Sequence, residues 1–119
     1  PSATASTGFS LDAATVEGNK DGLFFFGTNG RQANPWGNGS SFQCVVPPVA
    51  RTTLLPETGT NGLCDGYHTL DLNAWFQAKP ATNPGAGQLV QGQFWYRDPG
   101  NASNRTSSLS DAVEFTVCP

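Results

Sequence analysis

Apolar and polar residues alternate along two long segments near the end of the chain, Gln88–Asp98 and Leu109–Cys118. A period of two is typical of a strand that buries one face and exposes the other. We therefore predict two long strands, which bring the aromatic and charged residues of the first segment close to the second. The upstream segments are expected to complete a sandwich around this pair.

Shorter segments of the same character precede these two. The run Leu23–Gly27 is continuously apolar, as expected of a strand that is buried on both faces. The other segments with a strand pattern are Phe9–Val16, Phe42–Val46, Tyr67–Ala78 and, as an edge strand, Val49–Leu55. Turn residues dominate Thr28–Ser41 and Pro56–Gly66, which we predict to be loops with several turns.

These elements predict an all-β fold. No segment of useful length has an apolar period of 3.6 residues, and 14 Gly and 9 Pro residues interrupt the chain. About seven short strands joined by long Gly- and Pro-rich loops favour an antiparallel β-sandwich, Ig-like or jelly-roll-like. A length of 119 residues favours one domain. We assign residues 9–119 to that domain and residues 1–8 to an N-terminal arm or linker.

The charge content of the chain is low. Charged residues make up 13% of the sequence, whereas about 25% is typical of soluble proteins. The net charge is −3 and the six Lys and Arg residues form no cluster, which argues against binding to nucleic acid. No apolar stretch approaches the length of a membrane span, so we expect no insertion into a membrane. We predict a processed, secreted protein from three observations. They are a surface of Ser, Thr, Asn and Gln, a start at Pro1 and the lack of methionine.

The chain has three cysteines, Cys44, Cys64 and Cys118. An odd number in a small secreted domain leaves one cysteine over. The simplest pairing is a Cys44–Cys64 disulfide, which would stabilise the fold by roughly 3 kcal/mol. Cys118 would then be free or bonded to another chain, although its pairing with either of the other two remains open. A metal or redox site is disfavoured because there is no CxxC motif and only one histidine, so we predict no metal and no cofactor.

The sequence offers no convincing catalytic group. His68 is the only histidine, and no nucleophile motif accompanies it. On one strand, His68 and Asp71 would point to opposite faces, which argues against a shared metal site with Asp65. The nine acidic residues give no reason to prefer any pair for glycoside hydrolysis. We therefore predict no catalytic residues, and a small secreted enzyme is the least favoured interpretation.

Two kinds of candidate carbohydrate site are present. Sequons for N-glycosylation begin at Asn38, Asn101 and Asn104, all in predicted loops. Five aromatic residues could stack on sugar rings from one sheet face: Trp36, Tyr67, Trp75, Trp95 and Tyr96. Tyr67, Trp75 and Trp95 are the favoured candidates, and Trp75 and Trp95 are expected on outward faces. This second feature favours a carbohydrate-binding module as the alternative function.

Four segments resemble a known bacterial module. They are GLFFFGTN at Gly22–Asn29, ANPWGNG at Ala33–Gly39, QFWYRDP at Gln93–Pro99 and LSDAVEFTVCP at Leu109–Pro119. Together they resemble a C-terminal module of secreted proteins from planctomycetes, myxobacteria and related bacteria. That resemblance implies an extracellular bacterial origin and a β-rich accessory domain with no established activity.

The residues that carry this resemblance are expected to form a structural signature of the fold. They are Trp95, Tyr96, Arg97, Asp98 and Asp111. Arg97 is predicted to meet Glu114 or Asp111 across the two long strands, in an exposed pair worth under about 1 kcal/mol.

The favoured function is that of a non-catalytic structural or adhesive protein at a bacterial surface. It would associate with itself, as a filament or sheath subunit, or with a cell-surface partner or a polysaccharide. In the self-association hypothesis, Pro1–Phe9 adds as a strand to an exposed sheet edge of a neighbour, and Cys118 locks the contact.

Overall fold

The structure is a computed structural model that describes residues 1–37, 39–101 and 105–119. These residues form nine strands, one α-helix and one 3-10 helix: β1 (Ser10–Val16), β2 (Lys20–Gly27), β3 (Arg31–Trp36), β4 (Ser41–Val45), β5 (Ala50–Arg51), β6 (Leu55–Thr58), β7 (Gly66–Asp71), α1 (Leu72–Ala78), η1 (Pro80–Thr82), β8 (Leu89–Arg97) and β9 (Ser107–Thr116). All strand pairs are antiparallel. The predicted all-β antiparallel sandwich is confirmed, with nine strands instead of about seven. No helix in the described residues is long and apolar enough to cross a membrane.

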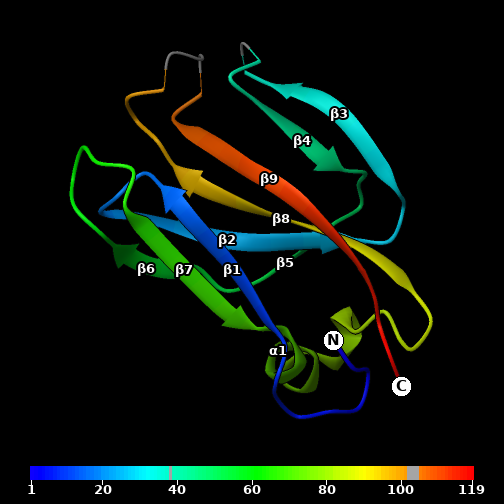
Figure 1. Ribbon diagram of the computed structural model, residues 1–119. Helices are drawn as coiled ribbons and strands as arrows, with labels where there is room; N and C mark the ends of the chain where they lie inside the picture. Colours follow the sequence, from blue (N-terminus) through cyan, green and yellow to red (C-terminus); the bar gives the residue numbers. More distant parts are fainter. Residues whose placement is uncertain (38, 102–104) are drawn as a thin grey trace.

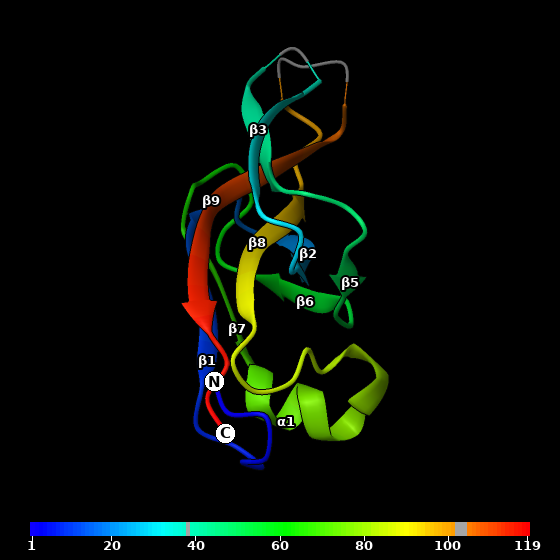
Figure 2. The same ribbon diagram turned by 90° about the vertical axis from the view of Figure 1, so that its right-hand side faces the viewer.

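The strands form a central sheet and two further two-stranded sheets that pack against it. Figure 1 shows β1 crossing in front of β2 of the central sheet. The central sheet has the order β5–β2–β8–β9, with β6 also paired to β2. The β1–β7 pair and α1 cover one face, and the β3–β4 hairpin covers part of the other. Figure 2 shows the hairpin above the central sheet and α1 below it.

Two hydrophobic cores result from this arrangement. The first core lies between the central sheet and the β1–β7 layer, and its buried residues are Leu11, Ala13, Val16, Phe24, Phe26, Leu72, Phe76, Val90, Phe94 and Val117. The second core lies under the hairpin and is built on Phe25, Val45 and Leu109. Phe24 and Phe26 thus enter one core and Phe25 enters the other. This confirms the prediction that the apolar run of β2 is a strand buried on both faces.

A β-bulge lets β9 contribute to both cores. Its register against β8 shifts between the pair Gln93–Ala112 and the pair Trp95–Leu109, so β9 carries one extra residue there. Such a bulge changes the face to which the following side chains point. Leu109 therefore enters the second core, whereas Val117 enters the first. Ser110 supports the bulge, since its hydroxyl oxygen accepts a hydrogen bond of 3.0 Å from the Phe94 N–H.

The predicted strand at Tyr67–Ala78 is half wrong, because α1 begins at Leu72. Asp71 is the N-cap of this helix, and its Oδ1 accepts a hydrogen bond of 3.1 Å from the Ala74 N–H. Leu72 and Phe76, four residues apart, lie on one helical face and are fully buried in the first core. The pattern Leu72–Ala74–Phe76 fits a strand as well as a short helix, and the Asp71 cap was the signal that distinguishes them.

Two strands lie where loops were predicted. β3 has mostly polar residues and contains Pro35, which an edge strand tolerates because its N–H is not needed for pairing. β6 overlaps the start of the segment predicted as turns and pairs with β2, so Leu55–Thr58 is part of the central sheet. In both cases contacts with a neighbouring strand outweigh weak local propensity.

Residues 1–8 lie against their own chain. Ser2 forms a parallel bridge with Cys118: the Ala3 N–H donates to the Cys118 carbonyl and the Cys118 N–H donates to the Pro1 carbonyl, each at 2.8 Å. Side-chain amides from α1 and the segment after η1 also bind this segment, as when Asn83 Nδ2 donates to the Ala3 carbonyl at 2.9 Å. The N-terminal segment therefore closes the end of the first core.

Candidate functional site

A cavity among the described residues lies over the second core, beside the β3–β4 hairpin. It has a volume of about 260 Å³ and an apolar floor. We call it the tryptophan pocket, and its lining residues are Leu23, Phe25, Trp36, Gln43, Val49, Arg51, Trp95 and Leu109. A concave, mainly apolar site with a few polar groups is the usual form of a small-molecule site.

The register of the central sheet places the floor and one wall of this pocket. Leu23 of β2 lies opposite Trp95 of β8, and Phe25 lies opposite Arg51 of β5. Because directly opposed residues in an antiparallel pair share a face, these four side chains point to the same side. Residues more than 70 positions apart in the chain thereby line one site.

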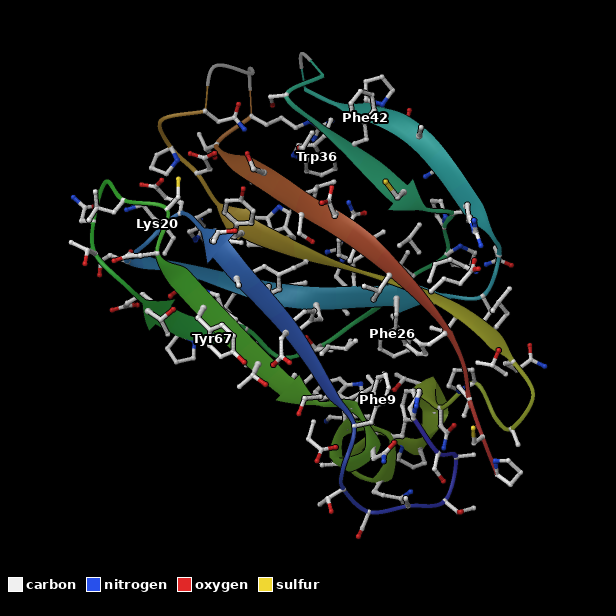
Figure 3. The ribbon with its side chains drawn as sticks, viewed as in Figure 1. Phe9, Lys20, Phe26, Trp36, Phe42 and Tyr67 are labelled. Atoms are coloured by element: carbon white, nitrogen blue, oxygen red, sulfur yellow. The ribbon has the colours of Figure 1, made fainter. Side chains whose placement is uncertain are left out.

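The opposite wall comes from the hairpin, through Trp36 at the end of β3 (Figure 3). Its indole Nε1–H donates to the Ser107 carbonyl at 3.2 Å and to the Ser107 hydroxyl at 3.3 Å. The Arg105 guanidinium lies over the indole ring, 4.1 Å from its centroid. These contacts hold the indole in one orientation before any ligand binds.

Two buried glutamines of β8 attach the hairpin to the central sheet. The Gln93 side chain accepts a hydrogen bond of 3.0 Å from the Cys44 N–H and donates to the Phe42 carbonyl at 2.7 Å. The Gln91 Oε1 accepts from the Gly30 N–H at 3.1 Å. The amide groups therefore replace the backbone pairing that a neighbouring strand would provide.

The predicted pairing of Arg97 with Glu114 or Asp111 is wrong. Glu114 instead forms an ion pair with Arg31 of the hairpin, and Gln91 Nε2 donates to the same carboxylate at 2.9 Å. Hydrogen bonds from Arg31 and then Gln91 lower the pKa of the Glu114 carboxyl to about 2. Arg97 lies opposite Ser107 and stacks over the Trp95 ring at 5.8 Å. Arg31 lies in the segment Thr28–Ser41, which was predicted to be a loop.

The other signature residues have structural contacts. Tyr96 packs against the first core, and burial raises the pKa of its hydroxyl group. The Asp98 carboxylate accepts a hydrogen bond of 2.8 Å from the Ser108 hydroxyl, and the Asp98 N–H donates to Thr106, so Asp98 helps to close the β8–β9 connection. Asp111 belongs to the extra-residue region of β9.

The aromatic residues predicted to stack on sugars do not share one surface. Trp75 lies on α1 and packs against the first core, while Trp95 packs against the second. Tyr67 is exposed on β7, and its hydroxyl donates to Asp12 at 2.9 Å. Figure 3 shows Tyr67 far from Trp36. The structure thus pairs Trp95 with Trp36 rather than with Tyr67 or Trp75.

The predicted Cys44–Cys64 disulfide is absent, because all three cysteines are unbonded. Cys44 lies on β4 of the hairpin and Cys64 lies in the β6–β7 loop. Figure 1 shows β4 and the β6–β7 loop well apart, at the upper right and the left of the view. The fold therefore separates the two cysteines that nearness in sequence had suggested as a pair. Cys118 is exposed beside the N-terminal segment.

Of the three sequon asparagines, only Asn101 lies within the described part of the chain; Asn38 and Asn104 lie outside it. Asn101 is partly buried, and its Nδ2 donates to the Ser107 carbonyl at 3.2 Å and to the Ser108 hydroxyl. Its amide nitrogen therefore has structural partners in this conformation.

The His68 side chain is buried against an aromatic residue of the first core. It is 3% exposed and its ring lies 4.8 Å from that of Phe94, with no hydrogen-bond partner for either nitrogen within the described residues. Burial lowers the pKa of the imidazole, so it is neutral at pH 7. Asp65 binds the Thr60 N–H at 2.7 Å, in a separate loop contact. In the described ranges, no three His, Cys, Asp or Glu side chains gather as metal ligands would.

Sequence reasoning named Trp36 and Trp95 among five candidate stacking residues but did not keep Trp36 in the favoured set, and it missed Gln43 and Arg51. The signal for Trp36 was an aromatic residue within a turn-rich segment. A comparison with known proteins adds no assignment: no family model matches the chain, and neither the curated proteins nor the solved structures contain a significant match.

Proposed function

We propose that this domain is a non-catalytic extracellular adhesive module, and that it binds one sugar ring of a polysaccharide in the tryptophan pocket. The observation that carries the proposal is the placement of Trp36 and Trp95 in one concave site of about 260 Å³.

The chemistry of the site matches that of a sugar ring. The C–H faces of a pyranose pack on indole rings, which offer a large apolar surface at little conformational cost. Gln43 and Arg51 supply polar groups at the same pocket, where sugar hydroxyl groups need hydrogen-bond partners. The volume is below the roughly 300 Å³ at which drug-sized sites begin, which favours a single ring with the rest of the chain outside.

The test is binding to immobilised polysaccharides, followed by intrinsic tryptophan fluorescence titration with those that bind. The Trp95→Ala variant is expected to lose binding, because it removes one wall of the pocket. The Tyr67→Ala variant is the matched control, since Tyr67 is an exposed aromatic residue outside the pocket. Binding by neither wild type nor control, or equal binding by the Trp95→Ala variant, would refute the proposal.

Self-association is the second candidate, supported by a groove between β1 and β9. The groove has a volume of about 330 Å³, and each of these strands has only one partner strand in the described sheets. Leu11 lies on one side, and Val113, which is 54% exposed, lies on the other. An extended segment of a second copy could pair with either open edge and place apolar side chains in the groove.

Sedimentation velocity and electron microscopy test this second candidate. If wild-type protein assembles, the Val113→Lys variant is expected to be monomeric, because it places a charge in the groove. Leu63→Lys is the control at an exposed apolar residue elsewhere. Monomeric wild-type protein at high concentration would contradict self-association and leave the pocket proposal intact.

A further inference from the structure

The charges around the tryptophan pocket define which sugar it would hold. Arg51 lines the pocket, and Arg97 stacks on Trp95, one of its walls. No acidic residue is among the lining residues. This is unexpected in a chain of net charge −3 that has more acidic than basic residues.

Neither arginine forms an ion pair with another residue in the described part of the chain. The salt bridge found within the described residues is that of Arg31 and Glu114, which lies at the hairpin rather than in the pocket. Arg51 and Arg97 have no carboxylate within ion-pair distance in the described residues. Both guanidinium groups therefore keep donors for a ligand.

The position of Arg97 also favours an anionic partner. A guanidinium stacked on an indole uses its planar face, and its N–H groups at the edge stay available for a carboxylate. A carboxylate accepts two such N–H groups side by side, which gives orientation as well as affinity. We propose that the ligand is an acidic sugar, whose ring lies on the tryptophans and whose carboxylate is bound by Arg51 and Arg97.

This inference rests on the proposed function, since it names the kind of sugar that the same pocket binds. The experiment uses the whole domain and three uronate polysaccharides: polygalacturonate, alginate and hyaluronate. Each is compared with its own carboxyl-reduced form, which keeps the backbone and removes the charge. Affinity is measured by tryptophan fluorescence and by calorimetry.

We expect wild-type protein to bind at least one acidic polymer roughly five- to tenfold more tightly than its reduced form, the range of about one ion pair. Arg51→Gln and Arg97→Gln should each reduce this preference, because each weakens binding to the acidic polymer more than binding to its reduced form. The preference should also decline toward about 1 M salt, where the Debye length is about 3 Å. Lys79→Gln is the charge-matched control, because Lys79 caps α1 on the other side of the central sheet.

The outcomes separate the two proposals. Equal affinity for acidic and reduced forms overturns the acidic-sugar inference and keeps the sugar-binding pocket. A preference that survives in both arginine variants, or that Lys79→Gln removes equally, also overturns the inference. Failure of wild-type protein to bind any polymer in either form overturns the proposed function together with the inference.

Discussion

Replacing Gly22 by alanine is expected to destabilise the fold by about 1–3 kcal/mol, the usual cost of overpacking a core. Gly22 lies on β2, opposite Tyr96 of β8. A methyl group there would lie 2.2 Å from Phe94 Cζ and 2.7 Å from the Trp95 carbonyl oxygen. Phe94 is 1% exposed and packs on Phe24 at a ring-centroid distance of 4.7 Å, so a shift of its ring would disturb the packing of the first core.

The assay is urea unfolding followed by circular dichroism, with thermal melting as a second measurement. A domain of this size should lose roughly 3–6 °C in Tm for each kcal/mol. Gly100→Ala is the control: its added methyl group meets nothing within 4 Å, so its effect should stay within about 0.5 kcal/mol. Adding Phe94→Leu to the Gly22→Ala variant should cost less than the sum of the single changes by at least about 0.5 kcal/mol. Additive effects, or a Gly22→Ala variant as stable as the control, would refute the packing argument.

Three further predictions concern buried or paired polar groups. His68 has a lowered pKa in the fold, so the unfolded chain binds more protons; stability should decrease as pH falls below about 6.5. His68→Leu should flatten that part of the urea midpoint profile, and an unchanged profile would contradict the prediction. Glu114 also has a lowered pKa, so its contribution is complete above about 4.5 and is lost as pH falls toward about 2. Glu114→Gln should therefore be less sensitive than wild type to acid between these values, and equal sensitivity would count against the ion pair with Arg31. Gln93→Leu leaves the partly buried Cys44 N–H without its acceptor, at a cost of about 1–3 kcal/mol. Amide hydrogen exchange at Cys44 should become faster than in wild type, while exchange at Phe24 in the central sheet changes less; equal acceleration at both would show that the hairpin is not held separately.

The fold class could be predicted because the strongest patterns belong to the most buried strands. The apolar run of β2 predicts a strand buried on both faces, and the alternation of β8 predicts a strand with two different faces. Burial of a strand face requires apolar residues at regular positions, so the sequence pattern reports it directly. β3 has no such mark, because it is an edge strand with mostly polar side chains and Pro35. The helix α1 was hidden by its length of seven residues, too short for its period to differ clearly from that of a strand.

The candidate site was less predictable because distant segments form it. Trp36 and Trp95 are 59 positions apart, and their proximity depends on where the hairpin docks on the central sheet. That docking depends on the buried side chains of Gln91 and Gln93. In the sequence, glutamines at alternating positions of a strand indicate a face exposed to solvent, so their burial was not predicted. The predicted Cys44–Cys64 disulfide was wrong for a related reason. The two cysteines are near in sequence, but the fold places Cys44 on β4 and Cys64 in the β6–β7 loop.

The parallel bridge between the two ends of the domain has a mechanical consequence. Pro1–Ala3 and Cys118 run in the same direction and share two backbone hydrogen bonds of 2.8 Å, and the Ser2 hydroxyl donates to the Pro119 carbonyl at 2.7 Å. A force that draws the ends apart pulls the two segments in opposite directions along their own axes. The bonds are then loaded in shear, and they must yield together rather than one after another. Tension would therefore be resisted at the bridge before it reaches either core, which is consistent with the adhesive role proposed above.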